Sequence, residues 1–310
     1  RPTEMARDHD SEEFFDPREV TEGPARKLET PSRNDEYRDE MGAEREQGTA
    51  AQANPSAPRS SGLRKVYDIR GRTYRLRTSE IATTLEIGQF RVLAVEDLRE
   101  FAYAGDKTRM RPEVENLIRQ GLVQMKSVPH EDKGKRQLLA LTKAGHRFLI
   151  QGRIAGKDQA LYHGFSKPRE AHHDADLYRL FQKAAEKIER AGGRNLSIVL
   201  DYELKRRVNH DLAKLGPDRV SSGHKRSVAE RHGLQVVSGK IPLPDVRIEY
   251  DTPDGDRARV DIELATSHYR LRNLAEKVRA GFSIYAHPSD VSNLRRVLDQ
   301  RELTAEILSL

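Results

Sequence analysis

Cysteine is absent from this 310-residue chain. Its absence excludes disulfides, thiolate metal sites and a cysteine nucleophile, and it fits a reducing cytoplasm, which is the localisation we expect. No apolar run approaches the roughly 18 residues of a membrane span, so we expect no membrane contact and no signal peptide. Charged residues make up 34% and hydrophobic residues 36% of the chain, which indicates a soluble protein with modest cores. The length predicts about two domains.

Positive and negative charges are unevenly distributed along the chain. Residues 1–60 hold 9 Lys and Arg against 15 Asp and Glu, whereas the remaining 250 hold 46 against 34. A basic body suits a nucleic-acid partner, because DNA phosphates supply much of such an affinity. Residues 1–62 have almost no apolar periodicity, and we expect a disordered acidic tail there. Such a tail is either inert, a tether or a contact for a protein partner.

Along residues 63–152 the spacing of apolar residues alternates between the period of a strand and that of a helix. A strand pair around Arg70 and Gly71 is followed by three helical patterns and then by a hairpin. The pattern predicts helices over 79–88, 95–104 and about 109–120, strands over 122–128 and 136–141, and a last helix after Thr142. Three helices followed by a hairpin with a basic tip are the winged-helix arrangement. The runs LIRQGLV and LLALTKAGHRFL closely resemble the MarR-type winged helix.

The winged-helix resemblance implies a DNA-binding surface. In this fold the third helix enters the major groove and the hairpin, or wing, follows the backbone or the minor groove. Basic and polar residues at these places suit phosphates, and arginine also reads guanine. The candidates at the start of the third helix are Lys107, Thr108, Arg109 and Arg111, and those flanking the wing are Lys126, Lys133, Lys135 and Arg136. The alternative is a protein-contact domain with solvated charges.

Residues 153–173 are predicted to be a linker, and residues 174–310 a second domain. A helix over 174–191, a strand over 196–200 and a charged helical stretch over 202–214 come first. We interpret His172 and His173 as residues that cap or contact the first helix, since no ligand spacing surrounds them. A hairpin of two strands, 246–251 and 257–264, follows and turns at Asp254 and Gly255. A helix over 269–282, a strand over 283–286 and a helix over 289–303 complete the pattern.

Three carboxylates gather on this hairpin. Asp261 and Glu263 share one face of the second strand, and Asp245 lies near their level at the start of the first strand. Converging carboxylates repel one another unless a cation lies between them. Hard oxygen ligands of this number suit Mg²⁺ or Mn²⁺, which activate water and stabilise charge on a phosphodiester. The alternative is the polar face of an ordinary hairpin.

The sequence Pro244-Asp245, followed by Asp261-Ile262-Glu263, resembles the PD-(D/E)xK nuclease signature. The resemblance implies that Asp245, Asp261 and Glu263 hold the metal. Three positions for the lysine of that signature remain open. Glu263 replaces it, or Glu263 is the second acid and Ala265 stands at the lysine position, or the lysine has moved to the following helix, where Lys277 is the candidate. In the last case Lys277, or Arg270, would offset transition-state charge, and Tyr269 is a conceivable nucleophile.

The whole pattern predicts an α+β protein, in which a winged helix precedes a PD-(D/E)xK-like domain with an α-β-β-β-α-β core. With the run IELATSHYR, this combination resembles the replication-relaxation family of plasmid and mobile-element proteins. The resemblance implies a DNA-binding protein of DNA relaxation, mobilisation or replication. Two forms of that function stay open: a Mg²⁺-dependent nickase or endonuclease, and a non-catalytic regulator whose second domain dimerises or docks a partner.

Overall fold

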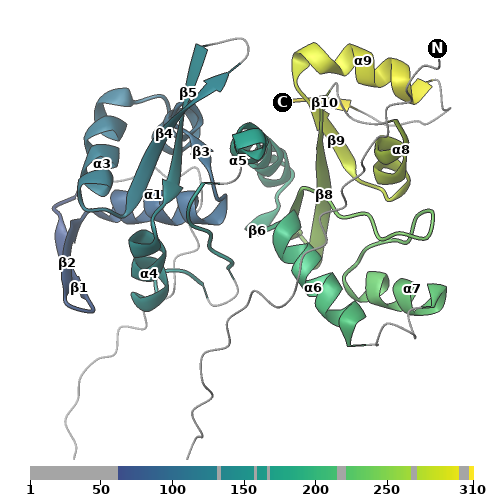
Figure 1. Ribbon diagram of the computed structural model, residues 1–310, viewed down its shortest axis with the longest axis horizontal. Helices are drawn as coiled ribbons and strands as arrows, with labels where there is room; N and C mark the ends of the chain where they lie inside the picture. Colours follow the sequence, from purple (N-terminus) through teal and green to yellow (C-terminus); the bar gives the residue numbers. More distant parts are fainter. Residues whose placement is uncertain are drawn as a thin grey trace, which may run out of the picture. The chain divides into compact units, whose positions relative to one another are not determined.

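The computed structural model describes residues 62–130, 134–156, 159–165, 168–214, 221–266, 271–299 and 307–310, which form an α+β structure (Figure 1). The expected disordered tail lies outside this part of the chain, apart from Gly62. In the described residues, no helix is long and apolar enough to cross a bilayer.

The N-terminal half alternates helices with short strands. Its elements are β1 (Lys65–Ile69), β2 (Arg72–Leu76), α1 (Thr78–Gln89), β3 (Leu93–Ala94), α2 (Val95–Asp97), the π-helical segment η2 (Leu98–Ala102), α3 (Lys107–Arg119), β4 (Val123–His130), β5 (Gly134–Leu141) and α4 (Lys143–Gln151). β1 and β2 form a hairpin, and β5 lies antiparallel between β3 and β4. The first turn is tight because Arg70 and Gly71 both have positive φ.

Helix α4 packs closely on the start of β4. The Thr142 side chain caps it by accepting a hydrogen bond from the Gly145 N–H at 3.0 Å. A Cβ on Gly145 would lie 2.1 Å from the backbone oxygen of Leu122, so only glycine permits this approach. The sequence Thr-Lys-Ala-Gly therefore fixes both the beginning of α4 and its distance from β4.

The C-terminal half is built on one mixed sheet. Its elements are α5 (Pro168–Arg190), β6 (Arg194–Leu200), α6 (Asp201–Ala213), α7 (Ser222–Arg231), β7 (Val246–Asp251), β8 (Arg257–Ala265), α8 (Leu271–Arg279), β9 (Ser283–Ala286), α9 (Pro288–Asp299) and β10 (Ile307–Ser309). The strand order is β10-β9-β8-β7-β6. β7 is antiparallel to both neighbours, whereas β8, β9 and β10 are parallel.

Side chains from the two faces of this sheet enter different cores. Residues toward α5 join the larger core, and they include Ile198, Leu200, Val246, Ile248, Ile262 and Leu264. Residues on the other face pack with α6, α7, α8 and α9, and they include Val199, Ala265, Ile284 and Ala286. This alternation is the period of two expected of strands covered on both faces. It also places Asp261 and Glu263 on the α8 side.

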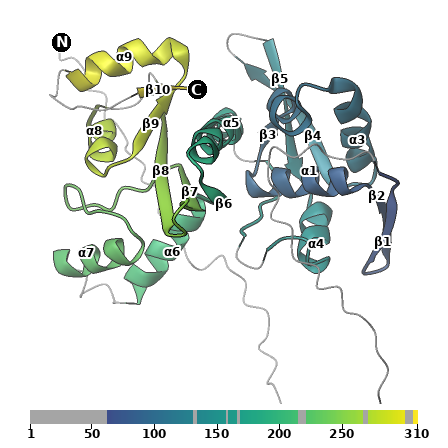
Figure 2. The same cartoon turned by 180° about the vertical axis from the view of Figure 1, so that it is seen from behind.

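Helix α5 belongs to both halves, and both views place it between their sheets (Figures 1 and 2). It begins at Pro168, inside the segment expected to be a linker. Phe90 packs against Tyr178 and Phe181 of α5, with ring centroids 5.0 and 5.2 Å apart. One core cluster runs from the N-terminal half through α5 to the C-terminal sheet. The described residues thus belong to one compact unit.

Candidate functional site

The first candidate surface lies at the beginning of α3. The Asp106 side chain caps this helix by accepting a hydrogen bond from the Arg109 N–H at 3.0 Å. Lys107, Thr108 and Arg111 are exposed there. Arg109 differs from them, because it is half-buried with its guanidinium 5.8 Å from the Tyr103 ring centroid. Three of the four residues expected on this helix therefore face solvent.

The β4–β5 hairpin brings a second set of cations toward the start of α3. Lys135 on β5, Lys107 on α3 and Arg99 line one concave surface. Lys126 is exposed on β4, and its ammonium lies 6.0 Å from the Phe165 ring centroid. Lys133 lies outside the described residues. The structure thus brings Lys107 and Lys135 together, although 28 positions separate them in the sequence.

Arg136 was expected to face DNA, but the structure buries it. Its guanidinium pairs with Glu96 at 2.6 Å, Asp97 at 2.9 Å and Asp176 at 2.8 Å. Asp176 belongs to α5 and also pairs with His287 at 3.0 Å. Burial alone would raise the pKa of Asp176, but hydrogen bonding to His287 and the Arg136 charge lower it. Arg136 therefore joins the hairpin to α5, and it is not available to phosphates.

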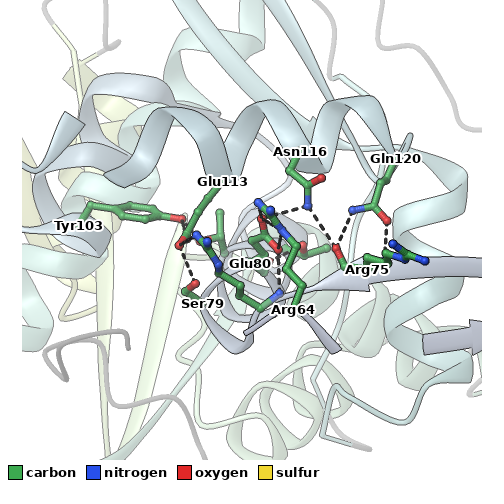
Figure 3. A network of polar contacts seen from close by, with 11 residues as sticks. Arg64, Arg75, Ser79, Glu80, Tyr103, Glu113, Asn116 and Gln120 are labelled. Atoms are coloured by element: carbon green, nitrogen blue, oxygen red, sulfur yellow. Dashed lines mark hydrogen bonds and ion pairs between the residues drawn. The ribbon is translucent and has the colours of Figure 1, made fainter. Parts of the chain in front are cut away.

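A buried polar network sets the position of α3 (Figure 3). Glu80 of α1 and Glu113 of α3 are fully buried. Glu80 pairs with Arg64 at 2.8 Å and accepts a hydrogen bond from Asn116 of α3 at 3.0 Å. Glu113 accepts hydrogen bonds from the hydroxyl groups of Ser79 and Tyr103, each at 2.8 Å.

The Gln120 amide completes this network by bonding the backbone of Arg75 on β2 at 2.8 and 2.9 Å. Helix α3 is thereby fixed to both α1 and the β1–β2 hairpin. Because a buried charge is costly to leave unpaired, these contacts hold α3 in one orientation.

The second candidate site is the group of carboxylates on β7 and β8. Asp245 lies just before β7, where its Oδ2 accepts a hydrogen bond from the Leu264 N–H at 2.9 Å. Glu263 is fully buried on β8 and pairs with Lys277 of α8 at 2.8 Å. The Lys277 ammonium also donates to the backbone oxygen of Leu243, the residue before Pro244, at 2.5 Å. Asp245, Glu263 and Lys277 therefore lie at the same end of the β7–β8 pair, with Lys277 bonded to Glu263 and Asp245 bonded to the backbone of the next residue, Leu264.

Asp261 lies apart from this group. Arg247 of β7 stands opposite Asp261 in the strand register and binds both of its carboxylate oxygens, at 2.6 and 2.8 Å. Arg247 also donates to the His232 carbonyl at 2.5 Å. The bidentate pair saturates Asp261. Each of the three carboxylates thus has a cationic partner of its own: His173 for Asp245, Lys277 for Glu263 and Arg247 for Asp261.

His173 is a partner of Asp245 that the sequence pattern did not reveal. Its Nε2 lies 3.5 Å from Oδ1 of Asp245. Burial alone would lower the pKa of His173, but the contact with Asp245 and the charges of Asp174 and Glu263 raise it to about 9. His173 is thus protonated at neutral pH.

Asp201, the first residue of α6, adds another acid beside this region. Its backbone N–H donates to the Asp245 carbonyl at 3.0 Å. Burial, and after it the charges of Asp245 and Asp174, raise the pKa of Asp201. The side chain is therefore easier to protonate than an ordinary aspartate.

The donor set fits a divalent ion in part. Among the residues the structure describes, no group of three or more His, Asp and Glu side chains is arranged to hold a metal. Mg²⁺, however, is bound in many phosphate-handling sites by one or two carboxylates plus substrate phosphates and water. Asp245 and Glu263 supply such a pair. The expected third ligand, Asp261, does not, and Tyr269 and Arg270 lie outside the described residues.

Comparison with models of protein families, with curated proteins and with solved structures finds no match. The functional argument therefore depends on the residues and geometry of this chain.

Proposed function

We propose that this chain is a DNA-binding protein in which α3 and the β4–β5 hairpin contact duplex DNA as a winged helix does. The order helix, strand, helix, helix, hairpin supports this assignment. The observation that carries it is the meeting of Lys107, at the start of α3, with Lys135, on the hairpin, at one concave surface. Cations held this way neutralise successive phosphates and release counterions.

The experiment measures binding of the full chain to a DNA duplex by fluorescence anisotropy over a range of salt concentrations. We expect Lys107→Ala with Lys135→Ala to weaken binding for all sequences. The slope of log affinity against log salt should fall by about two, since each phosphate contact contributes about 0.9. The matched control, Lys65→Ala with Lys143→Ala, removes two exposed lysines from β1 and α4. Equal losses in the two double variants would contradict the assignment.

The wider role we propose is DNA relaxation, mobilisation or replication of a mobile element. It is supported by the resemblance to the replication-relaxation family. The second half of the chain runs α5-β6-α6-α7-β7-β8-α8-β9-α9-β10, which contains the helix–strand–strand–strand–helix–strand order expected of a PD-(D/E)xK-like core when α6 and α7 are counted as an insertion. Homodimerisation and a protein partner for residues 1–62 stay predictions of the same interpretation.

Phosphodiester cleavage is a second candidate function. It is favoured by the contacts of Lys277 with Glu263 and with the backbone of Leu243, two residues before Asp245, and by the bond from the Leu264 N–H to the Asp245 carboxylate. Asp245 and Glu263 would hold Mg²⁺, and the ion would supply an activated water. Lys277 would place positive charge beside the reacting phosphate. The pairing of each carboxylate with a cation, His173, Lys277 or Arg247, favours the rival interpretation, a non-catalytic regulator.

Nicking of supercoiled plasmid in Mg²⁺ or Mn²⁺ distinguishes the two forms. If the chain cleaves, Asp245→Asn and Lys277→Ala should each reduce the rate at least about a hundredfold, the scale of losing one electrostatic group in a site. Asp261→Asn is the matched control, because Arg247 binds its carboxylate away from the site. Its melting temperature must be compared with that of the wild type. Absence of nicking in the wild-type chain would leave the regulator interpretation.

A further inference from the structure

An exposed tyrosine stands beside the acidic site. Tyr202 is 56% exposed, although most aromatic residues of the described chain are buried or half-buried. It is the second residue of α6, directly after Asp201, whose N–H is bonded to the Asp245 carbonyl. The start of α6 is therefore bonded to the backbone of Asp245, and Tyr202 is the next residue.

Arg91 is held over this ring by an unusual turn. Its guanidinium lies 5.7 Å from the ring centroid of Tyr202, and its NH1 lies 3.5 Å from Oδ2 of Asp174. The backbone forms a γ-turn, since the Val92 N–H donates to the Phe90 carbonyl at 2.6 Å while φ of Arg91 is 63°. This left-handed conformation is strained for a residue with a side chain, and such strain concentrates at functional sites.

The surroundings of the ring suit a nucleobase better than a row of phosphates. Arg206 follows Tyr202 by one helical turn and is exposed on α6. Asp174 lies 3.5 Å from the Arg91 guanidinium and offsets part of its charge. An exposed aromatic face with a guanidinium beside it is the arrangement on which unpaired bases stack, with little dependence on sequence.

We propose that Tyr202 and Arg91 form a stacking platform for an unpaired base, so that the acidic site takes DNA with a single-stranded segment. This inference rests on the proposed function and specifies its substrate. A duplex held by α3 and the hairpin would deliver its unpaired end to the platform, and the phosphate next to the stacked base would lie toward Asp245.

The experiment compares the full chain on a blunt duplex with the same duplex carrying a short oligo-dT tail. Wild-type protein should bind the tailed DNA about tenfold more tightly or better, the scale of stacking one base on an aromatic ring. Tyr202→Ala should abolish that gain and leave blunt-duplex affinity unchanged, whereas Tyr202→Phe should retain it. Ile150→Ala, which shortens a side chain 50% exposed on α4, is the control and should change neither. A 2-aminopurine in the tail should be quenched on binding by the wild type and not by Tyr202→Ala.

The outcomes distinguish failure of the proposed function from failure of the stacking platform. Failure to bind the blunt duplex would overturn the proposed function. Blunt-duplex binding with no gain from the tail, or a gain that survives Tyr202→Ala, would overturn the stacking platform alone.

Discussion

At the scale of single residues, four ion pairs between a cation and a buried or half-buried carboxylate join different elements. Arg64 and Glu80, Arg136 and Asp176, Arg247 and Asp261, and Lys277 and Glu263 each connect segments separated by 14 to 40 positions. Removing the cation of such a pair leaves a buried or half-buried carboxylate uncompensated, which costs more than the pair itself contributes. The main role of these eight residues is therefore to fix the positions of the elements they join. Of the eight, Lys277 and Glu263 also lie at the Asp245 end of the β7–β8 pair.

His173 gives the site a dependence on pH. Its pKa is raised from 6.5 to about 9 in the folded chain, so its stabilising effect is fully present below about pH 6.5 and is lost as pH rises through about 9. We expect His173→Gln to lower the melting temperature most at about pH 6, with a difference that shrinks steadily toward pH 9. Thermal melts across this range measure it.

The control for that prediction is His210→Gln, which replaces an exposed histidine on α6. It should show little effect at any pH in the range. A His173→Gln effect that grows as pH rises would contradict the proton-linked contact with Asp245.

From the sequence, the arrangement of the carboxylates could be predicted only for contacts within the β7–β8 hairpin. The period of two and the turn at Asp254-Gly255 predicted that Asp245 lies near both Asp261 and Glu263. They also place Arg247 opposite Asp261, a pairing that the register alone could have revealed. The partners from α5 and α8, His173 and Lys277, depend on how helices pack on the sheet. No local pattern encodes that packing.

At the scale of elements, helices and strands with a strong apolar period were predicted from the sequence. Short elements, and elements shared between the two halves, were not. The order of helices and hairpins in 64–151 follows the expectation closely. The π-helical turn Leu98–Ala102 and the strand Ile307–Ser309 carry no distinctive period, because each is fixed by neighbours. β10, for example, pairs with β9 at the edge of the sheet. Helix α5 extends into the expected linker since its first turns pack on β3 and β5.

The seating of α4 on β4 gives a test at this scale. Gly145→Ala would place a Cβ 2.1 Å from the Leu122 oxygen, so α4 must move away from the sheet. We expect a loss of about 1–3 kcal/mol in the free energy of unfolding, as for other overpacked sites. Gly156→Ala is the matched control, because its Cβ would meet nothing within 4 Å and should change stability by less than about 0.5 kcal/mol. Urea unfolding of the two variants measures the difference.

At the scale of the whole molecule, α5 decides whether the two predicted domains are independent. It covers Val92, Ala94 and Leu138 with its own Ala171 and Ala175. It also carries Asp176, the partner of buried Arg136, and its Leu177 and Leu180 reach the core of the C-terminal sheet. The N-terminal half therefore lacks a complete core without α5. Under the proposed function, a duplex bound by the N-terminal half would be held at a fixed position relative to Asp245.

We predict from this sharing that a fragment of residues 62–156 unfolds at lower temperature than a fragment of residues 62–192, although the expected domain boundary falls near 152. The shorter fragment exposes the apolar residues that α5 covers and leaves Arg136 without Asp176. Each buried apolar side chain contributes about 1.5–3 kcal/mol. The full chain should melt in one cooperative transition, because one core spans both halves. Calorimetry of the three proteins measures these transitions. Two separated transitions in the full chain, or equal melting of the two fragments, would show that the halves fold independently and that α5 only lies against the first.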